Sequence, residues 1–231
     1  MPCCLYLLCR FERSTILQLG LAGPQGNTEH LIEEMAKKIQ KKGARCEILH
    51  LTEFVEKKII LEDIQEKLQK ADGFVSIAGP GQRASQTLRV QLEKQPIMIK
   101  NEAYRVIDSL EKGVIVKDVN PLLTTLFRES VQPYLISWFK YEPCAEIRKL
   151  KTPVLILQGD ADLQVKVWDA ERLHVCNMNS QMDIIDDMNH VLKVLSSPDD
   201  MNENIASYSN PNLPISARMM AIITEFINRN N

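Results

Sequence analysis

Apolar residues recur along the chain in two patterns, as short continuous runs and as stripes with helical spacing. The short runs predict strands, which we expect at 16–22, 46–51, 73–78, 153–158 and 182–185. The stripes predict helices, which we expect at 31–39, 62–70, 84–94, 102–111, 167–175 and 215–228. Short apolar strands separated by helices favour a parallel sheet with right-handed crossovers. The pattern therefore predicts an α/β protein.

Residues 80–150 interrupt this alternation, because they carry helical patterns and no clear strand. We interpret them as a helical cap insertion, with an α/β core domain formed from residues 1–79 and 151–231. Within the insertion stands an aromatic group, Tyr134, Trp138, Phe139 and Tyr141. Its spacing fits two interpretations, a lining for an acyl pocket beneath the cap or the packed face of a helix, and periodicity favours the packed face.

The composition is that of a globular protein with a substantial core, since 45% of the 231 residues are hydrophobic. The formal net charge of −2 leaves no basic footprint for nucleic acid. No apolar run approaches the ~20 residues of a membrane span. We expect a soluble cytoplasmic protein whose partner is a small-molecule substrate or ligand, without nucleic-acid or membrane partners. The composition leaves the oligomeric state open.

The cysteines are scattered and lack the paired CxxC spacing of a zinc site, so no metal site is expected. Their positions predict reduced thiols, with the first three in a loose start of the chain or in a first strand. The six are Cys3, Cys4, Cys9, Cys46, Cys144 and Cys176.

The turn at residues 23–28, GPQGNT, follows the first predicted strand and precedes the first predicted helix. Such a turn can cradle a phosphate on the helix N-terminus, hold a nucleophile on a strained elbow, or simply connect the two elements. Pro24 stands at the nucleophile position of the elbow pattern, and no GxSxG occurs anywhere in the chain. We therefore expect no serine nucleophile, and we interpret Thr28 as a helix cap.

From about Asp72 onward, four stretches resemble the C-terminal portion of α/β-hydrolases that carry a helical cap. They are DGFVSIAGPG, SVQPYLISWFKYEPCAEIRKL, KTPVLILQGDADLQV and IIDDMNHVLK. The resemblance implies a catalytic acid after the penultimate strand and a catalytic histidine after the last, which by position are Asp162 and His190. An imidazole can accept a hydroxyl proton, while a carboxylate on its other nitrogen fixes the tautomer. Taken alone, the two residues would be a capping aspartate and a loop histidine.

The N-terminal stretch ILQLGLAGPQGNTEHLIEEMAKKIQKKGARCEILHLTEF is similar to the start of flavodoxin-like NAD(P)H-dependent FMN reductases. This second resemblance implies FMN as a cofactor, with its phosphate held by Gln25, Gly26, Asn27 and Thr28. Against it, Glu29 adds a negative charge and the turn contains no Lys or Arg. The alternative that the turn merely connects strand and helix stays open.

The two resemblances meet at residues 71–73 and together imply a fold class. It is a three-layer α/β sandwich with a mainly parallel sheet, a flavodoxin-like strand order 2-1-3-4-5 and the helical cap insertion. The first strand would then occupy the place of the hydrolase strand that bears the nucleophile. We interpret such a join as a natural or engineered chimera, or as an extensively rearranged gene.

Three functions are compatible with these patterns. The first is an α/β-hydrolase-related protein of acyl-ester hydrolase (esterase) ancestry, without a cofactor. It retains acid and base but lacks the GxSxG serine, so it is weak or inactive. The second is an FMN-binding, flavodoxin-like reductase module. The third is a noncatalytic chimeric scaffold, and the sequence leaves open whether the chain is an enzyme at all.

Overall fold

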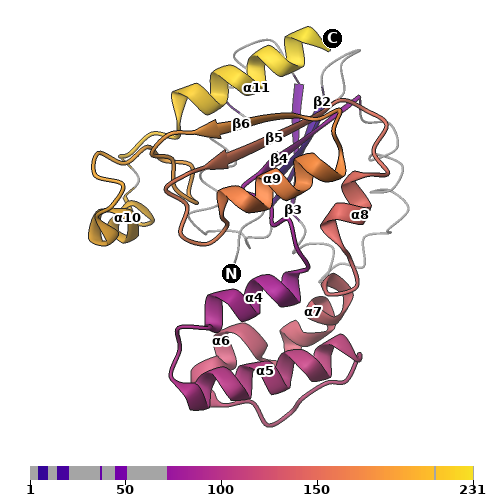
Figure 1. Cartoon of the computed structure of the whole chain (residues 1–231), viewed down its shortest axis with the longest axis vertical. Coiled ribbons are helices and arrows are strands. Elements are labelled where there is room, and N and C mark those ends of the chain that lie inside the picture. The colour runs from indigo at the N-terminus through magenta and orange to yellow at the C-terminus, as the bar shows by residue number, and fades with distance from the viewer. Residues whose placement is uncertain are drawn as a thin grey trace.

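The computed structural model describes residues 5–9, 15–20, 37, 45–50, 72–210 and 212–230, with side chains placed for Lys37 and from residue 72 onward. This part of the chain has an α/β fold, in which helices flank a six-stranded sheet of order β3-β2-β1-β4-β5-β6 (Figure 1). The strands are β1 (Leu5–Cys9), β2 (Thr15–Gly20), β3 (Arg45–His50), β4 (Gly73–Ile77), β5 (Val154–Gly159) and β6 (Gln181–Ile185).

The described sheet is mainly parallel, as the sequence predicts. β2 runs parallel to β3, and β4, β5 and β6 run parallel to one another. β1 lies between β2 and β4 and is antiparallel to both. The five predicted strands keep the relative order 2-1-3-4-5, but the flavodoxin-like order is not confirmed, because the additional strand β1 lies between the first and the third of them. A five-residue apolar run does not reveal its pairing partners, so the sequence could not place this strand.

The register of β1 decides what lies at each edge of the sheet. Tyr6 pairs with Leu19 of β2 on one side and with Ser76 of β4 on the other. The carboxyl ends of β2 and β4 therefore lie at the same edge, where β1 begins at Leu5 opposite Ile77. The expectation that the strand before the GPQGNT turn lies beside β4 is wrong, because β1 occupies that place and runs the other way.

The described helices match most of the predicted segments. The predicted helix at 62–70 lies outside the described residues, as does all of 31–39 except the helical Lys37. Helix α10 lies between residues 196 and 214, where the sequence pattern predicts no helix. The elements are α4 (Ala84–Leu92), α5 (Ile97–Glu111), η1 (Pro121–Leu123), α6 (Thr124–Phe127), η2 (Glu129–Val131), α7 (Gln132–Trp138), α8 (Pro143–Ile147), α9 (Val167–Cys176), α10 (Met201–Ser207) and α11 (Ala217–Arg229).

The two faces of β5 carry two separate hydrophobic clusters. Leu155 and Leu157 join a cluster with residues of α11, such as Phe226. Ile156 faces the opposite way and packs with Leu173 of α9. Figure 1 shows α11 on one side of the sheet and α8 with α9 on the other. β5 is thus buried on both faces, which is why its sequence is a continuous apolar run.

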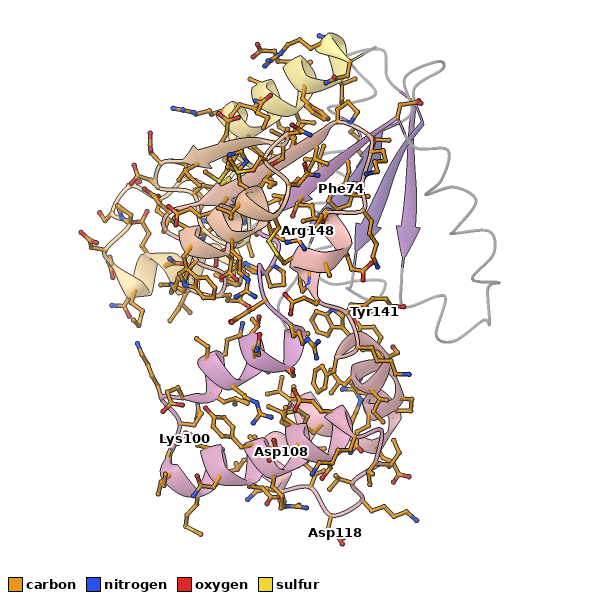
Figure 2. All side chains as sticks on the ribbon, turned by 45° about the vertical axis from the view of Figure 1, so that its right-hand side comes forward. Phe74, Lys100, Asp108, Asp118, Tyr141 and Arg148 are labelled. Atoms are coloured by element: carbon orange, nitrogen blue, oxygen red, sulfur yellow. A yellow bond between two sulfur atoms is a disulfide. The ribbon has the colours of Figure 1, made fainter. Side chains whose placement is uncertain are left out.

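Helices α4 to α7 pack around a hydrophobic cluster of their own, which includes Ile107, Leu110 and Phe127. The amide of Gln132 is buried there and donates to the carbonyl oxygens of Val116 and Phe127, each at 2.7 Å. Figure 1 shows these helices gathered beside one edge of the sheet, and Figure 2 labels three of their polar residues, Lys100, Asp108 and Asp118.

Three of the four aromatic residues singled out in the sequence belong to this helical cluster. Phe139 is buried in it, and Tyr134 and Trp138 pack against it with their ring centroids 5.7 Å apart. Tyr141 is 56% exposed instead. The observed arrangement is therefore a packed helix face rather than a pocket lining for the first three residues.

A disulfide between Cys144 and Cys176 joins α8 to the end of α9, with a Cα–Cα distance of 5.4 Å. The prediction of reduced thiols is wrong for this pair. The two cysteines are 32 residues apart in sequence and meet only because α8 packs on α9, which the spacing of cysteines does not show. Disulfides are typical of oxidising compartments rather than of the cytoplasm. The structure therefore does not support the expected cytoplasmic location, which stays a prediction. Within the described helices, none is long and apolar enough to span a bilayer.

Candidate functional site

The loops that follow β5 and β6 bring Asp162 and His190 together. Asp162 follows β5, which ends at Gly159, and His190 follows β6, which ends at Ile185. The Nδ1 atom of His190 lies 2.8 Å from Oδ2 of Asp162, and the two side chains are only 2% and 1% exposed. Carboxyl ends of neighbouring parallel strands meet at one sheet edge. The two residues that the hydrolase resemblance singled out are therefore in direct contact.

The hydrogen bonds around Asp162 determine the tautomer of His190. Oδ1 of Asp162 accepts hydrogen bonds from the backbone N–H groups of Gln164 at 2.7 Å and Val165 at 3.0 Å. Oδ2 accepts one from Nε2 of Gln158 at 3.1 Å. An ionised carboxylate can only accept, so the proton between the pair belongs to Nδ1 of His190. The lone pair is then on Nε2, which is the arrangement that a general base requires.

Gly159 allows the two loops to approach each other. A Cβ atom at this position would lie 1.9 Å from the carbonyl oxygen of Met188. On the other side of the contact, the backbone N–H of Asp187 donates to Oδ1 of Asp160 at 2.7 Å. Asp187 itself adopts a left-handed conformation with φ of 58°. The pair of Asp162 and His190 thus depends on a close backbone contact that only glycine permits.

Polar side chains connect helix α10 by hydrogen bonds to the loops that follow β5 and β6. Asn189, next to His190, donates to Oγ of Ser207 at 2.6 Å. Nζ of Lys193 donates to the carbonyl oxygen of the same serine at 2.8 Å. On the other loop, Asn204 donates to the carbonyl oxygen of Ala161 at 2.9 Å. Figure 1 shows the arrowheads of β5 and β6 pointing toward α10. The helix therefore holds the loops that carry the acid and the base.

Tyr208, which follows α10, adds a contact to the loop of the acid. Its hydroxyl accepts a hydrogen bond from Nε2 of Gln164 at 3.0 Å. Burial raises the pKa of this hydroxyl above its ordinary value, and the bond from Gln164 acts in the opposite direction. The tyrosine is therefore a neutral partner of the loop.

The turn after β4 packs on the start of α9. The carboxylate of Asp169 accepts hydrogen bonds from the backbone N–H groups of Gly81 at 2.7 Å and Lys166 at 3.0 Å. The pKa of Asp169 lies above its ordinary value, because the effect of burial is larger than the opposite effect of the two backbone hydrogen bonds. Nζ of Lys166 also reaches the carbonyl oxygen of Asp162 at 2.7 Å. The turns after β4 and β5 are thus connected through the first residues of α9.

The structure offers no serine to this pair in the part of the chain that it describes with side chains. Ser76 on β4 and Ser85 on α4 are buried, and neither hydroxyl has a hydrogen-bond partner among the described residues. Beside β4 lies β1, whose carboxyl end points to the opposite edge of the sheet. β1 therefore ends at the sheet edge opposite to the one at which Asp162 and His190 follow their strands.

A second contact between a serine and a histidine has a hydrogen-bond direction that does not suit general-base catalysis. Nδ1 of His174 lies 2.8 Å from Oγ of Ser180. That hydroxyl already donates its proton to the carbonyl oxygen of Asn177 at 2.7 Å. The ring nitrogen must therefore donate to the serine, so His174 does not act as its base.

The other candidate residues of the sequence lie outside the described part. Gln25, Gly26, Asn27 and Thr28 belong to residues whose placement is not described, and their role in holding a phosphate stays a prediction. Sequence reasoning missed Gln158. Its signal was a polar residue at the end of the otherwise apolar run PVLILQ.

Comparisons with protein-family models and with curated proteins find no match for this chain. Among solved structures, it is similar to a meta-cleavage product hydrolase from Pseudomonas fluorescens IP01, with 12% identity, a TM-score of 0.49 and coverage of 99% of this chain and 95% of that chain. An esterase from Thermogutta terrifontis shares 9% identity at a TM-score of 0.49, with 98% and 93% covered. A thioesterase domain of the curacin biosynthetic pathway shares 11% identity at a TM-score of 0.42, with 98% and 95% covered.

Proposed function

We propose that the chain is an α/β-hydrolase relative of esterase ancestry that keeps an acid and a base but has no serine nucleophile. The observation that carries this proposal is the buried hydrogen bond between Nδ1 of His190 and Oδ2 of Asp162. It supports the roles of base and acid because each residue follows one of two neighbouring parallel strands, at the positions that the resemblance implies. The direction of β1 supports the loss of the nucleophile.

The chemistry of the pair follows from its protonation. Nε2 of His190 accepts a proton from a hydroxyl group, and Asp162 stabilises the imidazolium that results. Without a serine beside the base, no acyl intermediate forms on the protein, and the usual two-step hydrolysis of an ester is lost. We assign residues 80–150 the part of a cap over this site and residues 1–79 and 151–231 the part of the core domain. The substrate class is a small acyl ester.

Hydrolysis and active-site labelling test this proposal together. We expect wild-type protein to hydrolyse 4-nitrophenyl acetate no faster than a His190→Ala variant, because the base has no serine hydroxyl to activate and no acyl intermediate can form. A fluorophosphonate probe, which labels activated serines, should leave the chain unlabelled by mass spectrometry. Saturable turnover that depends on His190, with stoichiometric labelling of Ser76 or Ser85, would show that a substitute nucleophile exists.

FMN binding is the second candidate function. It is favoured by the parallel pairing of β2 with β3 and by the carboxyl end of β2, which opens at the same sheet edge as those of β4 and β5. Ligands of open α/β sheets bind at such edges. In this proposal Gln25, Gly26, Asn27 and Thr28 hold the phosphate of the flavin. The N-terminal part would then descend from a flavodoxin-like module in a chimeric chain. If neither ester hydrolysis nor FMN binding is found, the third alternative, a noncatalytic chimeric scaffold, is favoured.

A flavin titration tests the second candidate. Because a residue without Cβ lets the backbone come close to an anion, Gly26→Val should weaken FMN binding by more than tenfold, or about 1.4 kcal/mol. Thr28→Ala should cost less, on the order of 1 kcal/mol for one hydrogen bond. Quenching of flavin fluorescence measures both, with circular dichroism as the control for folding. Absence of quenching by wild-type protein at high micromolar FMN would leave the turn a connector.

A further inference from the structure

Gln158 stands at an unusual place for an amide side chain. It lies in β5, is fully buried, and its neighbours in the strand are the apolar residues of both sheet clusters. Its Nε2 atom lies 3.1 Å from each of three acceptors, which are the carbonyl oxygens of Gly159 and Val165 and Oδ2 of Asp162. The side chain thus links the end of β5, the acid and the far end of the loop that carries the acid.

The orientation of the Gln158 amide is determined by these acceptors. Its Oε1 atom is buried and has no hydrogen-bond partner in the described part of the chain. Turning the amide over would place Oε1 against three oxygen atoms that can only accept, so the observed orientation is the favourable one. An unpaired buried oxygen opposes folding. The three contacts of Nε2 are what offset this cost.

The contact with Asp162 has a particular geometric effect. Both backbone N–H groups that bind this carboxylate, from Gln164 and Val165, bind the same atom, Oδ1. Anchoring one oxygen leaves the carboxylate group able to rotate about that anchor. Within the described part of the chain, Gln158 is the donor to Oδ2 besides His190. The amide therefore holds the second oxygen in the direction from which His190 approaches.

We propose that Gln158 is a positioning residue for the acid and base, because its N–H fixes the Asp162 carboxylate so that Oδ2 accepts the Nδ1 proton of His190. The catalytic meaning of this inference rests on the proposed function. The arrangement itself exists in the resting protein, with or without substrate. It can therefore be tested without any measurement of activity.

Nitrogen NMR of protein labelled with ¹⁵N-histidine provides the test. In wild-type protein, the Nδ1 proton of His190 should give a distinct signal that exchanges slowly with water, because it is buried in a hydrogen bond. In Gln158→Met, which keeps the volume but has no donor, exchange of this proton should accelerate at least tenfold. The nitrogen shifts should also move toward an average of the two tautomers.

Gln132→Met is the matched control. Gln132 is also fully buried and also donates to backbone carbonyl oxygens, but in the helical cluster rather than beside the acid. It should leave the His190 signals unchanged, whereas a general loss of stability would affect both variants alike. If Gln158→Met does not fold, Gln158→Asn keeps the amide but withdraws it from Asp162, and the same change in the His190 signals is expected.

The outcomes separate this inference from the proposed function. Wild-type His190 signals in a folded Gln158→Met or Gln158→Asn variant would overturn the positioning role, whatever the ester assay shows. Serine-dependent hydrolysis would overturn the proposed loss of the nucleophile and leave the NMR result standing.

Discussion

Replacing Asp162 by alanine is expected to lower the free energy of unfolding by about 3–5 kcal/mol, the cost of removing one partner from a buried, hydrogen-bonded pair. The substitution leaves the backbone N–H groups of Gln164 and Val165 and the Nδ1 proton of His190 without their acceptor. Each buried donor that loses its acceptor adds its own penalty. Urea unfolding followed by circular dichroism measures the change.

Asp160→Ala is the matched control for this prediction. Asp160 lies in the same loop and carries the same charge, but it is exposed and accepts a single backbone hydrogen bond. Its removal should cost less than about 1 kcal/mol. Equal losses in the two variants would mean that the buried pair contributes nothing special to stability.

Asp162→Asn separates stability from chemistry. Because Oδ1 of Asp162 receives two backbone donors, the amide oxygen of asparagine should take that place and its NH₂ group should face His190. The imidazole would then carry its proton on Nε2, the wrong nitrogen for a base. The nitrogen shifts of His190 report this exchange of tautomers. Retention of the Nδ1 proton in this variant would contradict the assigned hydrogen-bond directions.

The second large effect is expected at Gly159. Gly159→Ala should lower the free energy of unfolding by about 2–4 kcal/mol, as severe overpacking does. The added Cβ would lie 1.9 Å from the carbonyl oxygen of Met188 and 2.6 Å from its carbonyl carbon. These are backbone atoms, so the loops after β5 and β6 must separate to make room. Thermal or urea unfolding measures the loss.

Gly113→Ala provides a contrast of a different physical kind. Gly113 has a φ of 77°, and apart from the glycine itself and its two chain neighbours no atom of the described residues lies within 4 Å of the place of its Cβ. The cost there is conformational only, about 1–2 kcal/mol. Gly159→Ala should also broaden the His190 signals, which Gly113→Ala should not do. Stability of Gly159→Ala within about 0.5 kcal/mol of wild type would show that the two loops adjust freely.

The parts of the site that could be predicted from sequence are those encoded locally. β4 and β5 are mainly apolar because both faces of each strand meet a cluster of hydrophobic side chains. Asp162 and His190 follow their strands directly, so placing the strands also placed the two residues at one sheet edge. Their hydrogen bond also required the close backbone contact between Gly159 and Met188, which the sequence pattern does not show.

The remaining features depend on contacts between distant residues. In the segment MNENIAS of α10 the apolar residues Met201 and Ile205 are exposed. The buried residues are the polar Asn204 and Ser207, which form hydrogen bonds to loops that are distant in sequence. The disulfide of Cys144 depends on the packing of α8 on α9. The position of β1 in the sheet depends on which strands it pairs with, and a five-residue apolar strand can pair with many different strands.

The antiparallel strand β1 has a consequence for how the sheet comes together. It forms a hairpin with β2, in which Cys9 pairs with Ile16, a local contact that closes a short loop. Its other side pairs with β4, which is distant in sequence, and this contact unites β2 and β3 with β4, β5 and β6. The two parallel groups therefore become one cooperative sheet only when β1 docks on β4. Before that step β1 and β4 each present an unpaired edge, and such edges are sites where strands of other chains can add and start aggregation.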